Sequence, residues 1–270
     1  MIPVTDDKRM LGYELLSSHP DILHFVTTRH GGTSEDAYGT FNCSPFCGDN
    51  PFSVTANQKL LCADLGISLD ALVFPRQVHG KGVLVIDENF THADEAGKAR
   101  LLDGVDALVT CLPGYCLCIS TADCVPVLLY DKVNHAIGAV HAGWRGTVDN
   151  ILLHTLSEMK RLSGTDGKSL YAVIGPGISK DAFEVGDEVY ERFCSEGFPM
   201  NKISFRNKES GKYHIDLWEA NKLQLMDFGI PQENIQVAGI CTYTRHENFY
   251  SARRLGISSG RLVSGIMFIK

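Results

Sequence analysis

Four short apolar segments follow one another between residues 105 and 141, and no helix-length stretch separates them. They are rich in Val, Ile, Leu, Tyr and Cys, are bounded by Gly, Pro, Asp or Asn, and read VDALVT (105–110), YCLCIS (115–120), VPVLLY (125–130) and HAIGAVH (135–141). Such segments are typical of β-strands. A strict alternation of strands and helices fails over this stretch, which argues against a doubly wound parallel sheet and favours a mixed one.

The rest of the chain predicts further strands and several helices. The strands lie at residues 72–74, 82–86, 169–174 and 235–241. Residues 146–162 carry apolar side chains about 3.6 residues apart, with Thr147 as the expected cap, and predict one amphipathic helix. Three more helices are predicted within PFSVTANQKLLCADLGI (51–67), DEVYERFC (187–194) and DLWEANKLQLMDFG (216–229).

These elements together predict an α+β fold in which helices cover mixed β-sheets. The chain of 270 residues has no internal repeat, no low-complexity tract and no linker long enough to separate two domains. Its apolar content of 44% and charged content of 21% are those of a chain that buries a substantial core. We therefore expect a single layered domain over residues 1–270.

Charge and cysteine content limit the partners and the compartment. The formal net charge of −7 argues against a protein held on nucleic acid, which needs a basic face. No apolar run approaches the roughly 18 residues of a membrane span, and MIPVTDDKRM at the start is no export signal. We expect a cytoplasmic monomer that acts on a small molecule, and nine cysteines that stay free thiols because that compartment is reducing.

Three side chains that bind metals well lie where predicted core strands meet turns. His79 follows FPRQV, Cys124 precedes VPVLLY, and His141 ends HAIGAVH. Strand ends of this kind often line a common cleft. Two imidazoles and one thiolate could hold Zn²⁺ and leave its fourth position open, which is typical of a catalytic zinc.

Residue types alone leave other interpretations of these three side chains open. Cys124 could be a small buried hydrophobe and each His a hydrogen-bonded core residue. Alternatively, Cys124 and His141 could form the thiolate–imidazole pair of a cysteine hydrolase. Their intervals of 45 and 17 residues match no short metal-binding motif, so spacing does not decide among these interpretations.

A set of short motifs points to one known family. They are, in order, RQVHG (76–80), DALVT (106–110), TADCVPVLLYD (121–131), AVHAGWRGTV (139–148), IGPGI (174–178), FEVGDEV (183–189) and SARR (251–254). On these motifs the chain resembles the YfiH/YlmD/FAMIN family, which has also been described as polyphenol oxidase or laccase-like. The resemblance extends from GTFNCSPFCGDNP (39–51) to Gly260-Arg261.

This resemblance implies a fold, an activity and a cofactor. The fold would be the YfiH-like α+β domain. The activity would be phosphorolysis of adenosine, inosine, guanosine and methylthioadenosine to the base and ribose 1-phosphate, together with deamination of adenosine. The His of VHG, the Cys of ADC and the His of HAGWRG are the family's zinc ligands, and they correspond to His79, Cys124 and His141.

The laccase-like description of the family implies copper instead of zinc. A set of two His and one Cys can bind copper. Multicopper oxidases, however, need many imidazoles, commonly in HxH pairs. This chain has ten His, and no two of them are separated by a single residue. We therefore place zinc ahead of copper and regard a copper-dependent polyphenol oxidase as a minor alternative.

Phosphorolysis also needs a cationic group beside the ribose to hold phosphate. We expect Arg145 to fill this catalytic role, because small residues surround it in HAGWRG and a helix begins directly after it. Arg254 of the tandem pair in SARR is the second phosphate contact that we predict. A salt bridge or a stack on Trp144 would be the structural alternative for Arg145, and a solvated chain end the alternative for Arg254.

Asn42 is the residue that we expect to bind the ribose hydroxyls. It lies next to a turn marked by Gly48-Asp49. Amide side chains in such places also stabilise turns through their own backbone, which is the structural alternative. The predicted ligands are thus a purine nucleoside and phosphate, with no nucleic acid or membrane partner.

Overall fold

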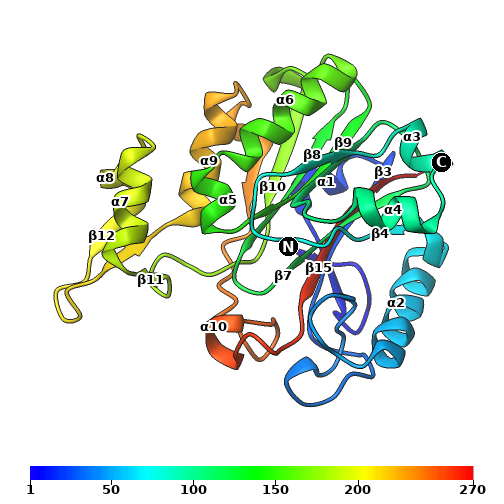
Figure 1. The fold of residues 1–270 in the computed structure, drawn as a ribbon, viewed down its shortest axis with the longest axis horizontal. Helices are drawn as coiled ribbons and strands as arrows, with labels where there is room; N and C mark the ends of the chain where they lie inside the picture. Colours follow the sequence, from blue (N-terminus) through cyan, green and yellow to red (C-terminus); the bar gives the residue numbers. More distant parts are fainter. Residues whose placement is uncertain (270) are drawn as a thin grey trace.

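The computed structural model describes residues 1–269 and contains two six-stranded β-sheets that pack against each other (Figure 1). The strands of the first sheet are, in spatial order, β1 (Ile2–Pro3), β2 (Met10–Gly12), β3 (Ile22–Thr27), β15 (Leu262–Phe268), β7 (Cys116–Thr121) and β4 (Leu72–Val73). Those of the second are β14 (Ile235–Val237), β10 (Leu170–Ile174), β8 (Val125–Asp131), β9 (Ala136–Ala142), β6 (Ala107–Thr110) and β5 (Val83–Val85).

Both large sheets are mixed, which confirms the predicted α+β class. The pairs β4–β7, β5–β6 and β10–β14 are parallel, and the remaining pairs are antiparallel. Side chains from β7 and β15 pack against side chains from β8 and β9 in one buried apolar cluster. Because this core joins the two sheets, we retain the prediction of a single domain over residues 1–270.

Helices cover the outer faces of the two sheets. The second sheet lies under α5 (Trp144–Val148), α6 (Ile151–Ser163) and α9 (Leu217–Asp227) (Figure 1). The outer face of the first sheet is covered by α2 (Pro51–Leu65), whose Leu61 is buried against it. Four further helices are short: α1 (Glu14–Ser17), α3 (Glu88–His92), α4 (Glu95–Leu101) and α10 (Ala252–Leu255).

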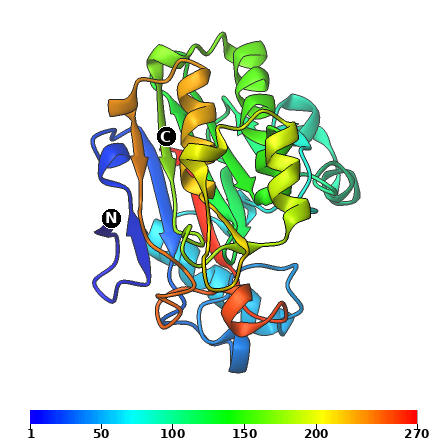
Figure 2. The same ribbon diagram turned by 90° about the vertical axis from the view of Figure 1, so that its left-hand side faces the viewer.

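A third, three-stranded sheet lies at one end of the molecule. It consists of β11 (Glu184–Val185), β13 (Tyr213–Ile215) and β12 (Ser204–Arg206), accompanied by α7 (Asp187–Ser195) and α8 (Met200–Ile203). This part is at the left of Figure 1 and faces the viewer in Figure 2. Within residues 1–269, no helix combines the length and the apolar character that crossing a bilayer requires.

All eight predicted strands are present. The prediction of one continuous helix over residues 146–162 is wrong. Two helices occupy this stretch, α5 and α6, because Asn150 adopts a left-handed conformation (φ 60°) between them. Thr147 therefore lies inside α5 and is no cap, while its hydroxyl lies 3.4 Å from the amide oxygen of Asn221. The apolar stripe is still correct, since Ile151, Leu152 and Met159 are all fully buried.

Candidate metal centre

The topology brings His79, Cys124 and His141 together at one end of the strands of the second sheet. Cys124 directly precedes β8, and His141 is the last residue but one of the antiparallel neighbour β9. His79 lies in the connection that leads into β5, which runs parallel to β6 at the side of β9. Their potential ligand atoms all lie within 4.8 Å of one another. The structure thus joins three residues that are far apart along the chain.

The donor set and its geometry fit a zinc ion. In tetrahedral zinc sites the metal–ligand bonds of about 2.0–2.3 Å place ligand atoms about 3.5 Å apart, so only small side-chain movements would be needed here. The rings of His79 and His141 meet edge to face, with centroids 4.8 Å apart. His141 is buried, Cys124 is half-buried and His79 is exposed, so the three-ligand set has one open side.

One buried carboxylate, Asp106, holds both histidines in place. Its Oδ1 lies 2.7 Å from Nδ1 of His141 and accepts the backbone N–H of His79 (2.9 Å). Its Oδ2 accepts the backbone N–H groups of Val78 (3.2 Å) and Gly80 (2.8 Å). Since Nδ1 of His141 faces Asp106, Nε2 is the nitrogen left for a metal. Asp106 therefore orients the ring of one ligand and the backbone of the other.

The backbone at this site is strained at two non-glycine residues. His79 has φ 62° and Asp123, the neighbour of Cys124, has φ 89°. Left-handed conformations of this kind cost on the order of 1–3 kcal/mol each and persist only where surrounding contacts enforce them. Asp106 supplies those contacts for His79. For Asp123 they come from the hydroxyl of Thr242 and the backbone N–H of Arg253, each 2.7 Å from its carboxylate.

The Cys124 thiol is activated in the metal-free protein. Burial raises its pKa, but the charge and hydrogen bond of His141 and the hydrogen bond of His79 outweigh burial and lower the pKa to about 6. Burial lowers the pKa of His141, but Cys124 and Asp106 outweigh burial and raise it to about 9. Both shifts favour the thiolate–imidazolium form of the pair, and a thiolate is the form of Cys that binds metals.

The small residues of HAGWRG make room for two of the three candidate ligands, His79 and Cys124. A Cβ added to Gly143 would lie 3.0 Å from Sγ of Cys124 and 3.4 Å from Cδ2 of His79. A Cβ added to Gly146 would lie 3.1 Å from the carbonyl oxygen of Gly80. The sequence suggested that this space surrounds Arg145. The structure shows instead that the His79 loop and Cys124 fill it.

A cavity of about 290 Å³ opens onto the three side chains. It lies between the two sheets, where β7 ends and β8 begins, and its wall includes Gln77, Ser120 and Thr121. Gln77 pairs with the backbone of Ser120 through both its amide oxygen and its amide nitrogen, each at 2.8 Å, and so completes the end of β7. The volume is at the lower end of the range for small-molecule sites.

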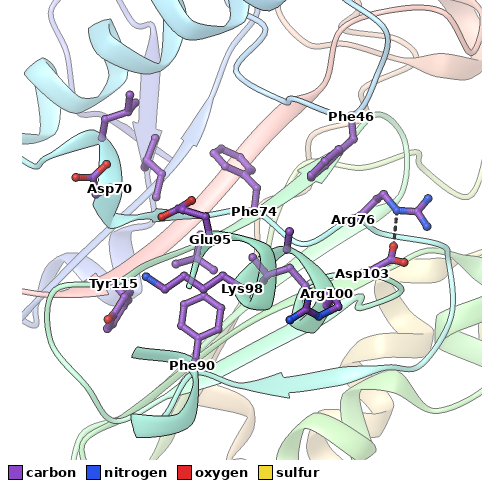
Figure 3. Close-up of a pocket in the computed structure, with 15 residues that line it drawn as sticks. Phe46, Asp70, Phe74, Arg76, Phe90, Glu95, Lys98, Arg100, Asp103 and Tyr115 are labelled. Carbon is purple, nitrogen blue, oxygen red and sulfur yellow. Dashed lines mark hydrogen bonds and ion pairs between the residues drawn. The ribbon is translucent and has the colours of Figure 1, made fainter. Parts of the chain in front are cut away.

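A larger cavity of about 630 Å³ lies next to this one (Figure 3). Phe46 lines both cavities, and the chain from residue 74 to residue 77 passes between them. Aromatic side chains, among them Phe74 and Phe90, face it together with Lys98, Arg100 and the ion pair Arg76–Asp103 (Figure 3). None of the three candidate ligands lines the larger cavity, so the smaller one is the candidate site.

The three residues predicted to contact substrate do not line the smaller cavity. Arg145 is exposed and stacks on Trp144, with 4.4 Å from its guanidinium carbon to the ring centroid. Arg254 is exposed beside Tyr243. Asn42 is fully buried, and its amide is engaged with four groups: Asp49, Cys47, Ser44 and Arg261. Their roles in catalysis and substrate binding stay predictions.

Two residues of the site were not singled out from the sequence. Asp106 offers a weak signal, because it is a charged residue directly before the apolar strand ALVT and inside the DALVT motif. Arg261 lines the smaller cavity beside the metal-ligating residues. Its signal in the sequence is the pair Gly260-Arg261 at the end of the family resemblance, and nothing local links it to the three candidate ligands, which lie 120 residues or more away along the chain.

Comparison with known proteins gives consistent results over the whole chain. A family model described as "Multi-copper polyphenol oxidoreductase laccase" matches residues 23–269. A protein of Bacteroides thetaiotaomicron named "Purine nucleoside phosphorylase" is 54% identical over 270 residues, which is 100% of both chains. A protein of an unknown prokaryotic organism named "Adenosine deaminase RL5" is 44% identical over 242 residues, 90% of this chain and 92% of its own.

Solved structures agree with these matches. The crystal structure of YfiH from Bacillus licheniformis superposes with a TM-score of 0.88 at 30% identity and covers 97% of each chain. YlmD from Geobacillus stearothermophilus superposes with a TM-score of 0.86 at 29% identity, over 96% of this chain and 95% of that one. The fold expected from the sequence motifs is therefore confirmed.

Proposed function

Because the chain belongs to the YfiH and YlmD family, the one described as multi-copper polyphenol oxidoreductase laccase, we propose that it is a zinc-dependent purine nucleoside phosphorylase that also deaminates adenosine. The observation that carries this proposal is the convergence of His79, Cys124 and His141 on one cavity. Relatives named for each of the two activities match nearly the whole chain.

The two activities require different bond-forming and bond-breaking steps at the site. In phosphorolysis a phosphate oxygen forms a bond to C1′ of the ribose, the C1′–N9 bond breaks, and the purine leaves with a proton. In deamination water adds at C6 of adenine and ammonia leaves. A bound zinc with an open position would supply a Lewis acid that lowers the pKa of water. Cys124 and the two imidazoles would hold the ion, and Asp106 would keep the His141 ring oriented.

The donor set favours zinc over the copper chemistry in the family description. Among residues 1–269, His79, Cys124 and His141 form the single group of three metal-ligating side chains that lie together. A multicopper oxidase would require several such groups, rich in imidazole. The proposed cofactor is therefore one zinc ion. Elemental analysis of protein purified without added metal distinguishes zinc from copper directly.

Product analysis tests the proposed function. Purified zinc-containing protein is incubated with adenosine, with and without phosphate, and the products are separated by chromatography. We expect adenine and ribose 1-phosphate only when phosphate is present, and inosine in both cases. Inosine, guanosine and methylthioadenosine are supplied in the same way to rank the substrates. The absence of every product from zinc-containing protein would overturn the proposal.

Thiol alkylation tests the role of Cys124 as a ligand. In metal-free protein at pH 7 we expect iodoacetamide to modify Cys124 rapidly, because the lowered pKa of about 6 leaves most of the thiol ionised. Zinc should block this reaction. Peptide mass spectrometry measures the labelling, and the exposed Cys194 serves as an internal control that zinc leaves unchanged.

The alkylation experiment also separates zinc from a cysteine hydrolase mechanism. The second candidate function rests on the Cys124–His141 pair, in which each side chain favours the charged form of the other in the metal-free protein. Labelling of Cys124 that zinc does not slow, together with activity that a chelator does not affect, would support the hydrolase. Protection by zinc and loss of activity with a chelator would reject it.

A further inference from the structure

Among residues 1–269, Arg261 is the one arginine on the wall of the cavity that contains His79, Cys124 and His141. It directly precedes β15 and is half-buried. No carboxylate lies within 4.0 Å of its guanidinium in the part of the chain that the structure describes. The wall of the cavity likewise carries no Asp or Glu. A half-buried cation without a counter-charge favours binding of an anion.

The guanidinium is held firmly by its own loop. Nη1 donates to the carbonyl oxygens of Ser259 (2.6 Å) and Gly260 (3.0 Å), and Nη2 donates to that of Ile257 (2.9 Å). These carbonyls orient the group without neutralising its charge. Within residues 1–269, the Nε–H has no acceptor. The side chain therefore keeps both its charge and a free donor.

Asn42 places Ser44 next to Arg261. Its Oδ1 accepts the backbone N–H of Ser44 (3.3 Å) and that of Arg261 (3.0 Å), although these two residues are 217 positions apart along the chain. The amide nitrogen of Asn42 donates to Asp49 (2.9 Å). Rotation of the side chain would therefore break hydrogen bonds of both the amide oxygen and the amide nitrogen. Asn42 is thus a positioning residue that joins two segments of the cavity wall.

Two hydroxyl groups near Arg261 lack partners. Ser44 lines the cavity and makes no hydrogen bond through its hydroxyl to any described residue, and this hydroxyl is accessible although the residue as a whole is almost fully buried. Thr121 lines the same cavity and is 1% exposed, and its Oγ1 has no partner in the described chain. Buried polar groups are normally satisfied, so unsatisfied hydroxyls in a cavity point to a ligand that would bind them.

We propose that Arg261 and Ser44, held together by Asn42, form the binding site for a tetrahedral oxyanion, the phosphate co-substrate, on the wall of the metal cavity. This inference rests on the proposed phosphorylase function. It assigns the phosphate contact to Arg261, in place of the exposed Arg145 and Arg254. Asn42 acts through Arg261 and Ser44 and does not touch the substrate.

Thermal unfolding tests anion binding without requiring activity. We compare the Tm of the protein in phosphate and in chloride of equal ionic strength, and in AMP as a nucleotide phosphate. At a phosphate concentration about ten times Kd we expect a rise in Tm of about 2 °C for the parent protein. Arg261→Gln should abolish this rise, and Ser44→Ala should reduce it. An equal rise in Arg261→Gln and the parent would overturn the proposal, as would stabilisation by AMP but not by phosphate.

Steady-state kinetics test the role of this anion in the reaction. We expect Arg261→Gln to raise the KM for phosphate by at least about tenfold, as loss of a charge-assisted hydrogen bond would. The KM for inosine should change much less. Arg261→Lys keeps the charge but loses the planar donor set, so it should give an intermediate KM for phosphate. Equal increases in both KM values would indicate a merely structural role and reject the proposal.

Arg206→Gln is the matched control for both measurements. Arg206 also donates to a loop carbonyl, that of Gly211 (2.7 Å), and it lies on β12, away from the cavity. If Arg261→Gln unfolds, Arg261→Lys and Ser44→Ala still test the site by the loss of phosphate stabilisation. If the parent protein fails to cleave any nucleoside, the proposed function fails, whereas the Tm comparison still decides whether Arg261 binds phosphate.

Discussion

Replacing Cys124 with alanine is expected to remove the metal and both activities. The substitution leaves two imidazoles, one of which is exposed, to hold an ion that needs three protein ligands. We expect zinc to fall from about one equivalent to less than a tenth of that. We expect activity to fall by more than about 100-fold, because even the loss of a residue that only orients a ligand costs 10- to 100-fold. Elemental analysis after gel filtration and product analysis with adenosine provide the two measurements.

Two controls make the Cys124→Ala result interpretable. Cys194→Ser removes an exposed thiol on α7, far along the chain from the cavity, and should keep full zinc content and activity. Circular dichroism shows whether Cys124→Ala is folded. His79→Ala and His141→Ala should reproduce the loss of zinc. A folded Cys124→Ala protein with one equivalent of zinc would refute the assignment of this centre.

Replacing Asp106 with asparagine is expected to weaken zinc binding and to destabilise the fold at the same time. The carboxylate accepts bonds through both oxygens, from His141 and His79 on one and from Val78 and Gly80 on the other. An amide presents one oxygen and one NH₂ group, so in either orientation its NH₂ group faces N–H donors. At least one buried donor is then left unsatisfied, which costs about 1–3 kcal/mol, and the strained loop at His79 loses its support.

The two effects of Asp106→Asn are measured separately. Competition with a chelator gives the zinc affinity, which we expect to fall by about 10- to 100-fold. Urea unfolding of the metal-free protein gives the stability, for which we expect a loss of about 2–4 kcal/mol. Asp103→Asn is the control, because Asp103 is exposed and forms an ion pair with Arg76 at the larger cavity (Figure 3). An Asp106→Asn protein that binds zinc as tightly as the parent would contradict the positioning role.

Most of the long strands could be predicted because their signals are local. Each buried strand is a short apolar run between turn residues, and all eight predicted runs form strands. The N-cap Asn50 and the left-handed Gly66 that bound α2 are also local signals. Seven strands were not predicted. Five of them, at residues 2–3, 10–12, 184–185, 204–206 and 213–215, have only two or three residues and carry no periodic pattern. The other two, β3 and β15, have six and seven residues and were missed although each is largely apolar.

Predictions failed where the outcome depends on contacts between distant segments. The break between α5 and α6 at Asn150 is an example, because the apolar stripe continues across it without interruption. The amide of Gln224 donates to the side chain of Asn150 (2.9 Å) and to the backbone carbonyl of Thr147 (2.8 Å). Gln224 lies on α9, and in a continuous helix the Asn150 side chain and the Thr147 carbonyl would have different positions.

Residue type and strand ends in the sequence were sufficient to predict the mixed fold class and to bring out His79, Cys124 and His141 as candidate ligands. The resemblance to a known family, carried by the motifs VHG, ADC and HAGWRG, then favoured a metal site over the other interpretations. Only the tertiary structure decided which other groups share their cavity. Asp106 reaches backbone donors 26 to 28 residues away, and Asn42 joins Ser44 to Arg261 across most of the chain. Hydrogen bonds between remote segments depend on how the two sheets pack, and no local pattern in the sequence encodes that packing.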